Sequence, residues 1–335
     1  MPHRSSIATT AAAVVLFPWS SGSGDAAFHR MRRPWCCGKC GAAGPSPLHK
    51  GERMPATRSA LSYDVFVAPE KPFVAPAPAV GDAPAWDPTT STLIFGARDA
   101  VLVDPLMTVQ EATALADWVA LHNRRLTTVY ITHGHGDHYL GLPVVLERFP
   151  DAQAVAAPGT VRLMQQQDAQ ALDDSLRARF PGQIADAVPL PEPLDSPEIR
   201  LEGSSIEVIA TGHTDTLDTT SLHVPDLDLI VAGDVAYNHC HMYVGATTTE
   251  SRADWIAALD RLAELNPTAV ISGHKDPTQG NPPTVIAESR GYLQYYGHLR
   301  DAGLPDQELF DAMVNRYPDW VSRQQFLLLE AVAQW

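Results

Sequence analysis

The sequence TVYITHGHGDH at residues 128–138 decides the fold of this chain. Its first four residues are β-branched or aromatic, which is typical of a buried strand. The next seven include four side chains that can bind metal: His133, His135, Asp137 and His138. Because alternate residues of an extended chain point the same way, His133 and His135 can converge on one point. Asp137 and His138, in the turn that follows, can reach a second point nearby.

A helix is expected directly after this turn. Residues 139–149 have apolar side chains at helical spacing, and Pro150 ends the pattern. Buried polar groups without partners are costly, so four of them at the end of a buried strand call for a bound partner. The order of strand, ligand-rich turn and helix therefore predicts a metal site.

The spacing His-x-His-x-Asp-His resembles the signature of the metallo-β-lactamase superfamily, and three later motifs resemble that family in the same order. Thr211-Gly212-His213-Thr214 is similar to its Gly-His-Thr turn, an apolar strand ends in Gly233-Asp234, and another ends in Gly273-His274. Upstream, residues 91–104 alternate as a hairpin that is similar to the family's opening strands, with Asp104 at a buried acidic position. The resemblance covers residues 66–302.

The resemblance implies an α/β fold, a four-layer αββα sandwich, with extra helices over about residues 282–335. Patterns along the chain agree with this expectation. Residues 110–123 and 251–265 have amphipathic helical spacing, and residues 159–180 are expected to form an exposed helical insertion. Apolar strands alternate with these helices in two similar halves. We expect residues 54–335 to form a single catalytic domain.

The resemblance also implies a dinuclear metal centre. The first metal would be held by His133, His135 and His213. The second would be held by Asp137, His138 and His274, and Asp234 would bridge the two ions. Two Zn²⁺ ions per chain are expected, with iron or manganese as alternatives.

The reaction expected from such a centre is hydrolysis. A hydroxide bridging the metals would attack the carbonyl of a lactone, ester or thioester, and Asp137 would orient it and carry its proton to the leaving group. The alternatives are hydrolysis of a β-lactam and the chemistry of a mononuclear iron sulfur dioxygenase, which uses the same fold. A member that has kept the fold without turnover is a third alternative.

Two further residues are candidates for the catalytic site. Tyr237 follows Asp234 by three residues, a spacing similar to that of the acyl-homoserine lactonases, and could donate to the oxyanion. Packing beneath the loop is the alternative for Tyr237. His241 is a candidate for substrate contact, and a surface position is its alternative.

The charge of the chain limits its partners. The formal net charge of −15 argues against nucleic-acid binding, which favours a basic face. Only about 40 residues separate Asp234 from His274, whereas the nucleases of the superfamily carry a long insertion there. We therefore expect a small-molecule substrate, no nucleic acid and no membrane partner.

The first 53 residues differ from the remainder. They hold seven of the 24 Lys and Arg residues but only two of the 39 acidic residues, together with Cys36, Cys37 and Cys40. The cysteines predict no definite zinc site, since a second pair does not follow. We expect translation to start at Met54 and the protein to be cytoplasmic. Alternatively, the apolar residues 7–17 belong to a leader, with a periplasmic or secreted protein.

Overall fold

The metal-binding motif follows strand β6, Arg125–Ile131, in the interior of a sheet. A computed structural model describes residues 61–74, 85–166 and 169–323, all of which belong to one compact unit, Ala56–Trp335. Within this part of the chain the main sheet has 11 strands in the order β8-β7-β6-β5-β4-β13-β12-β11-β10-β9, with β1 on β4. The predicted leader and the cysteines at 36, 37 and 40 lie outside the described residues.

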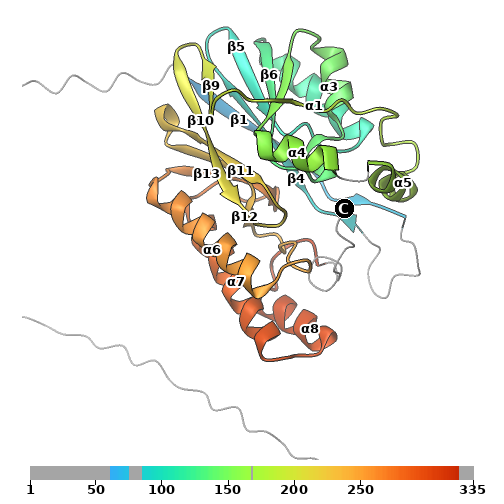
Figure 1. The fold of residues 1–335 in the computed structure, drawn as a ribbon, viewed down its shortest axis with the longest axis vertical. Helices are drawn as coiled ribbons and strands as arrows, with labels where there is room; N and C mark the ends of the chain where they lie inside the picture. Colours follow the sequence, from blue (N-terminus) through green and yellow to red (C-terminus); the bar gives the residue numbers. More distant parts are fainter. Residues whose placement is uncertain (1–60, 75–84, 167–168, 324–335) are drawn as a thin grey trace, which may run out of the picture. The chain divides into compact units, whose positions relative to one another are not determined.

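The first half of the sheet surrounds β6. Its strands are β1 (Ser62–Ala68), β4 (Thr89–Phe95), β5 (Asp99–Val103), β7 (Gln153–Ala156) and β8 (Glu192–Pro193). The predicted hairpin is confirmed as β4 and β5, which pair antiparallel, whereas β5 to β8 are parallel. Helices α1 (Val109–Leu121) and α3 (Leu142–Arg148) lie against this half (Figure 1).

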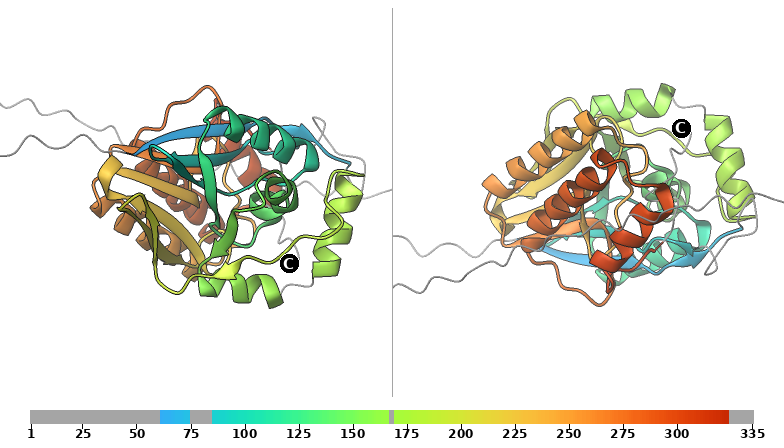
Figure 2. Two further views of the ribbon diagram at one scale, coloured as in Figure 1. Left: turned by 90° about the horizontal axis from the view of Figure 1, so that it is seen from above. Right: turned by 90° about the horizontal axis from the view of Figure 1, so that it is seen from below.

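The second half consists of β9 (Glu198–Leu201), β10 (Ser204–Gly212), β11 (Thr219–Val224), β12 (Leu229–Asn238) and β13 (Ala269–Lys275). Helices α6 (Thr249–Glu264), α7 (Thr284–Asp301) and α8 (Asp306–Arg316) lie on its outer side, as Figure 2 shows. The expected C-terminal helices over residues 282–316 are thus confirmed as α7 and α8. The rest of the stretch expected to be helical, residues 324–335, lies outside the described residues.

The two halves face each other across an apolar core. The pairing of β4 with β13 joins them at His274 and Thr89. Along β6, Val129 packs toward the helices of the first half, whereas Tyr130 packs into the core between the halves. Along β12, Ile230 and Val231 divide in the same way between the outer helices and that central core. This alternation of side chains produces the helix, sheet, sheet, helix layering that was expected.

The remaining elements are short. They are β2 (Lys71–Pro72), β3 (Ala85–Trp86), α2 (Gly136–Tyr139), α4 (Pro158–Gln166), α5 (Ala169–Arg179) and the 3₁₀ turn Pro225–Leu227. The helical insertion expected over residues 159–180 corresponds to α4 and α5 in the described part of this segment. Among the helices of the described ranges, none is both long and apolar enough to cross a bilayer.

The helix expected over residues 139–149 is observed as α3, and the one-turn helix α2 precedes it within the ligand-rich turn. Gly141 separates them, and a Cβ at this position would collide with the carbonyl oxygen of Pro105. The Gly141 amide donates to the carbonyl of Leu106 instead of continuing α2. This close approach of two backbones fixes the ligand-bearing α2 against the loop after β5.

Candidate metal centre

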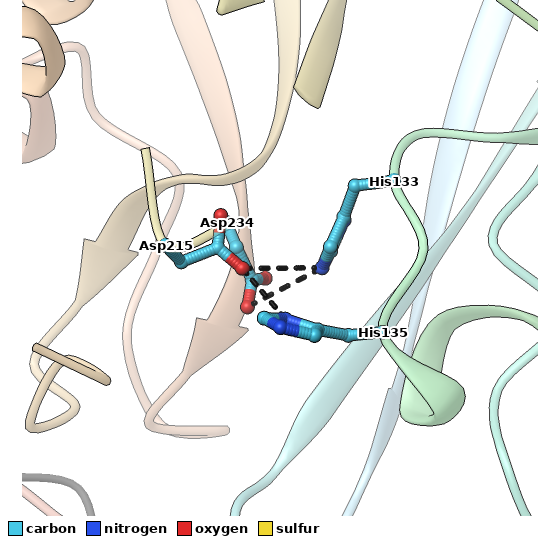
Figure 3. Close-up of side chains that lie close together, drawn as sticks. All are labelled: His133, His135, Asp215 and Asp234. Atoms are coloured by element: carbon cyan, nitrogen blue, oxygen red, sulfur yellow. Dashed lines mark ion pairs between the residues drawn. The ribbon is translucent and has the colours of Figure 1, made fainter. Parts of the chain in front are cut away.

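Two groups of metal-competent side chains meet after β6, beside β12 and β13, and at the turn between β10 and β11. The expectation that a strand ends at Asp234 is wrong, since β12 continues to Asn238. In each group the candidate ligand atoms lie within 4.8 Å of one another. Figure 3 shows the side chains of the first group pointing toward one another from separate segments. The first group is His133, His135, Asp215 and Asp234, and the second is Asp137, His138 and His274.

Asp234 connects the two groups. Its Oδ2 lies 3.8 Å from His133 Nε2 and 3.2 Å from His274 Nε2, and its Oδ1 lies 3.2 Å from His138 Nε2. One carboxylate thus faces imidazoles of both groups. The structure places Asp234 between them, where the sequence predicted a bridging ligand.

A hydrogen-bonded chain behind His133 and His138 turns their Nε2 atoms toward the site. His133 Nδ1 lies 2.9 Å from Thr132 Oγ1, which in turn donates to Asp104 Oδ2 over 2.8 Å. His138 Nδ1 lies 3.0 Å from the same carboxylate oxygen. With Nδ1 of each ring as the donor, Nε2 keeps its lone pair for a metal ion.

Hydrogen bonds also orient two side chains of the second group, His274 and Asp137. His274 Nδ1 lies 3.1 Å from the carbonyl oxygen of Pro88, which leaves its Nε2 free to face Asp137 and Asp234. Asp137 Oδ2 accepts a hydrogen bond of 3.1 Å from the indole of Trp86. The sequence pattern did not identify Trp86, because it lies about 50 residues before the motif and no local spacing connects the two.

Several buried polar atoms of the site have no hydrogen-bond partner among the described residues. Such atoms are rare in folded proteins, since each one costs about 1–3 kcal/mol when water is excluded. Here they face one another at the centre of the two groups, which is the arrangement that bound cations would satisfy. A metal cofactor therefore fits the residues that are present. The atoms are His133 Nε2, His138 Nε2, Asp215 Oδ2 and Asp234 Oδ1.

The charges of the metal-free site compensate one another through shifted pKa values. Burial alone would raise the pKa of Asp234, but the attraction of His274 and His138 outweighs it and holds this pKa well below the usual range. Burial would lower the pKa of His274, but Asp234 and Asp137 raise it to about 10. The carboxylates are therefore ionised and imidazolium groups balance them, so binding of cations must release protons.

The structure brings together six of the seven residues predicted as ligands, and His213 is the exception. His213 is half-buried and belongs to neither group, whereas the side chain of Asp215, two residues later, is fully buried in the first group. Strand β10 has a register shift between Ala210 and Gly212, and Gly212 has a φ of +86°. With this local distortion, Asp215, the residue after the Gly-His-Thr turn, enters the site and His213 does not.

The other two candidate residues are both buried, and Tyr237 directly contacts the site. The hydroxyl of Tyr237 donates to Asp234 Oδ2 over 2.8 Å, and its ring stacks on His274 with 5.2 Å between the centroids. His241 is fully buried, with Nδ1 2.9 Å from the hydroxyl of Tyr292 and its ring against Trp320. A surface position is thus wrong for His241, and its substrate contact stays a prediction.

Comparison with known proteins now identifies the family. The family model of the metallo-beta-lactamase superfamily matches residues 84–274, which include both groups of the site. The chain belongs to this superfamily.

Its curated relatives include hydrolases. A hydroxyacylglutathione hydrolase of Parasynechococcus marenigrum is 29% identical over 194 residues, which are 55% of this chain and 64% of the relative. A beta-lactamase-like protein 2 homolog of Caenorhabditis elegans is 26% identical over 55% of each chain. An atrochrysone carboxyl ACP thioesterase of Aspergillus fumigatus is 25% identical over 52% of this chain and 35% of the relative. The matches thus span at most about two thirds of these relatives.

Solved structures agree on the fold. A metallo-beta-lactamase family protein of Thermus thermophilus superposes with a TM-score of 0.53 at 19% identity, over 78% of this chain and 92% of that one. A metallo-beta-lactamase from Pontibacter korlensis superposes with a TM-score of 0.51 at 16% identity, over 70% and 99%. At these identities the likeness concerns the αββα architecture alone.

Gly273 offers a test of the position of Asp234. A Cβ at residue 273 would overlap Asp234 Oδ1, so Gly273→Ala must displace the shared carboxylate. We expect the variant to bind metal at least about tenfold more weakly, because even an outer-shell change costs 10–100-fold. Gly291→Ala in α7 is the control, since a Cβ there meets open space. Equal metal content of both variants after dialysis against a weak chelator would contradict this role of Asp234.

Proposed function

We propose that this protein is a dinuclear metal-dependent hydrolase, with zinc as the expected ion, that cleaves the acyl carbonyl of a thioester, ester or lactone. The observation that carries the proposal is the shared position of Asp234, which faces His133 of one group and His138 and His274 of the other. Two ions held on either side of one carboxylate would provide a water nucleophile of lowered pKa and polarise the substrate carbonyl.

Thioesters rank first among these substrates. Two of the curated relatives are named as a hydroxyacylglutathione hydrolase and an ACP thioesterase, and both names describe removal of an acyl group from a carrier. The support extends only to the matched segment, since each match covers only part of the relative. The net charge of −15 fits a small substrate better than a nucleic acid.

Asp137 is proposed as the residue that handles the proton. The Trp86 indole fixes its Oδ2, which also lies 3.3 Å from His274 Nε2. Attraction from His138 and His274 outweighs the effect of burial and lowers the pKa of Asp137, so that it is ionised at neutral pH. An ionised carboxylate in a fixed orientation can accept a proton from the attacking water and return it to the leaving group.

Tyr237 is proposed as a positioning residue for Asp234. Its hydroxyl proton is directed to Asp234 Oδ2, and its side chain is fully buried behind that carboxylate. This placement favours the packing alternative over donation to an oxyanion. Tyr237 would act on the reaction by holding the shared ligand in one orientation.

Replacement of Asp137 tests the proposed proton transfer. Asp137→Asn keeps the shape of the side chain and an acceptor for Trp86 but removes the basic oxygen. We expect turnover of a thioester to fall by about 10²–10⁴-fold, the usual contribution of general acid and base catalysis. Asp186→Asn, at an exposed surface carboxylate, is the matched control. A rate for Asp137→Asn within a few-fold of the control would overturn this assignment.

Tyr237→Phe separates positioning from oxyanion donation. If Tyr237 positions Asp234, the variant should bind metal more weakly and recover most of its rate at saturating metal. If it donates to the oxyanion, kcat should fall by about 10²–10³-fold with unchanged metal affinity. Metal titration followed by steady-state kinetics on the same preparation distinguishes the two, and we expect the first result.

A further inference from the structure

The turn between β10 and β11 directs a carboxylate into the first metal group where the sequence led us to expect an imidazole. Thr214 anchors this turn, because its Oγ1 contacts Thr219 Oγ1 and donates to Asp215 Oδ1, each at 2.8 Å. The amide of Thr214 also donates to the carbonyl of Thr216. With one carboxylate oxygen held in this way, Asp215 Oδ2 points at the histidines of β6.

Asp215 Oδ2 lies where a ligand is needed. It is 2.7 Å from His135 Nδ1 and 3.4 Å from His133 Nε2, and the side chain has no exposed surface. Neither contact has the geometry of a hydrogen bond, and none of the described residues donates one to this oxygen. Burying a carboxylate without a partner is costly. A cation shared by Asp215 Oδ2 and the two imidazole nitrogens would provide that partner.

We propose that Asp215, and not His213, is the ligand that this turn contributes to the first metal ion. The centre then contains three carboxylates and four imidazoles, from Asp137, Asp215 and Asp234 together with His133, His135, His138 and His274. The inference rests on the proposal that the site binds metal, and it is independent of which substrate is cleaved.

The exchange of an imidazole for a carboxylate changes the metal preference of the first group. Carboxylate oxygen is a harder ligand than imidazole nitrogen and suits Mn²⁺ better relative to Zn²⁺. The additional negative charge also offsets more of the charge of two divalent ions. A centre of this composition should therefore discriminate less strongly between zinc and manganese than one with three histidines in the first group.

The test compares neighbouring variants by metal binding, without any substrate. Asp215→Asn keeps the acceptor for Thr214 but removes the negative charge, and His213→Asn is its matched control. In competition with a chelator of known zinc affinity, wild type and His213→Asn should both bind two ions. Asp215→Asn should bind one of the two at least about tenfold more weakly, since loss of even an outer-shell partner costs 10–100-fold.

Asp215→His tests the same assignment through metal preference. Because it supplies an imidazole at the proposed ligand position, the ratio of zinc to manganese affinity should rise at least about tenfold, as judged from the affinity changes that follow altered metal ligation. The d–d absorption spectrum of the cobalt-substituted protein should change in Asp215→His and stay unchanged in His213→Asn. This readout remains informative if Asp215→Asn does not fold.

The opposite pattern would overturn the proposal. If His213→Asn loses an ion while Asp215→Asn keeps both, His213 is the ligand and the Gly-His-Thr turn is used as the sequence suggested. A protein that binds two ions in the expected way but does not cleave acyl substrates would refute the proposed function and leave the assignment of Asp215 standing.

Discussion

The need to balance buried negative charge governs this structure. Asp137, Asp215 and Asp234 are all buried, where repulsion between ionised carboxylates is weakly screened. Asp215 and Asp234 belong to one group, and Asp137 and Asp234 both face His274 Nε2. In the metal-free protein, histidines with raised pKa values provide the compensating charge. Divalent cations would replace those protons, and the atoms without hydrogen bonds mark where the cations would bind.

Asp104, in the loop after β5, holds residues of this charged centre in place by hydrogen bonds. Asp104 has a φ of +59°, a conformation that Asp tolerates better than most residues, and its carboxylate accepts from the Thr132 amide and hydroxyl. It also contacts His138 Nδ1. The loop after β5 thereby fixes the loop after β6, and two parallel strands become one rigid ligand platform.

The sequence predicts the parts of the site that lie on apolar strands or directly after them. His133, Asp234 and His274 follow apolar runs whose direction and burial are clear from the pattern, and the structure places them together. The hairpin and the layering follow from the same alternation of apolar side chains. The order of the motifs was predicted from the family resemblance, whereas the strands were predicted from the apolar pattern alone.

Irregular backbone explains what the sequence did not predict. The choice between His213 and Asp215 depends on a register shift and on Gly212 at positive φ, which are not visible in residue spacing. His241 follows the end of β12, where the chain turns at His239 with a φ of +51° and continues beneath Trp320. Its burial depends on contacts with α7 and the segment after α8, far along the sequence.

The most direct test of the account is an X-ray anomalous difference map of crystals of the full chain grown with zinc. The account predicts two peaks per chain, one among the side chains of each group, with the Asp234 carboxylate between them. A single peak, or two peaks of which neither contacts Asp234, would contradict a dinuclear centre built on this shared carboxylate.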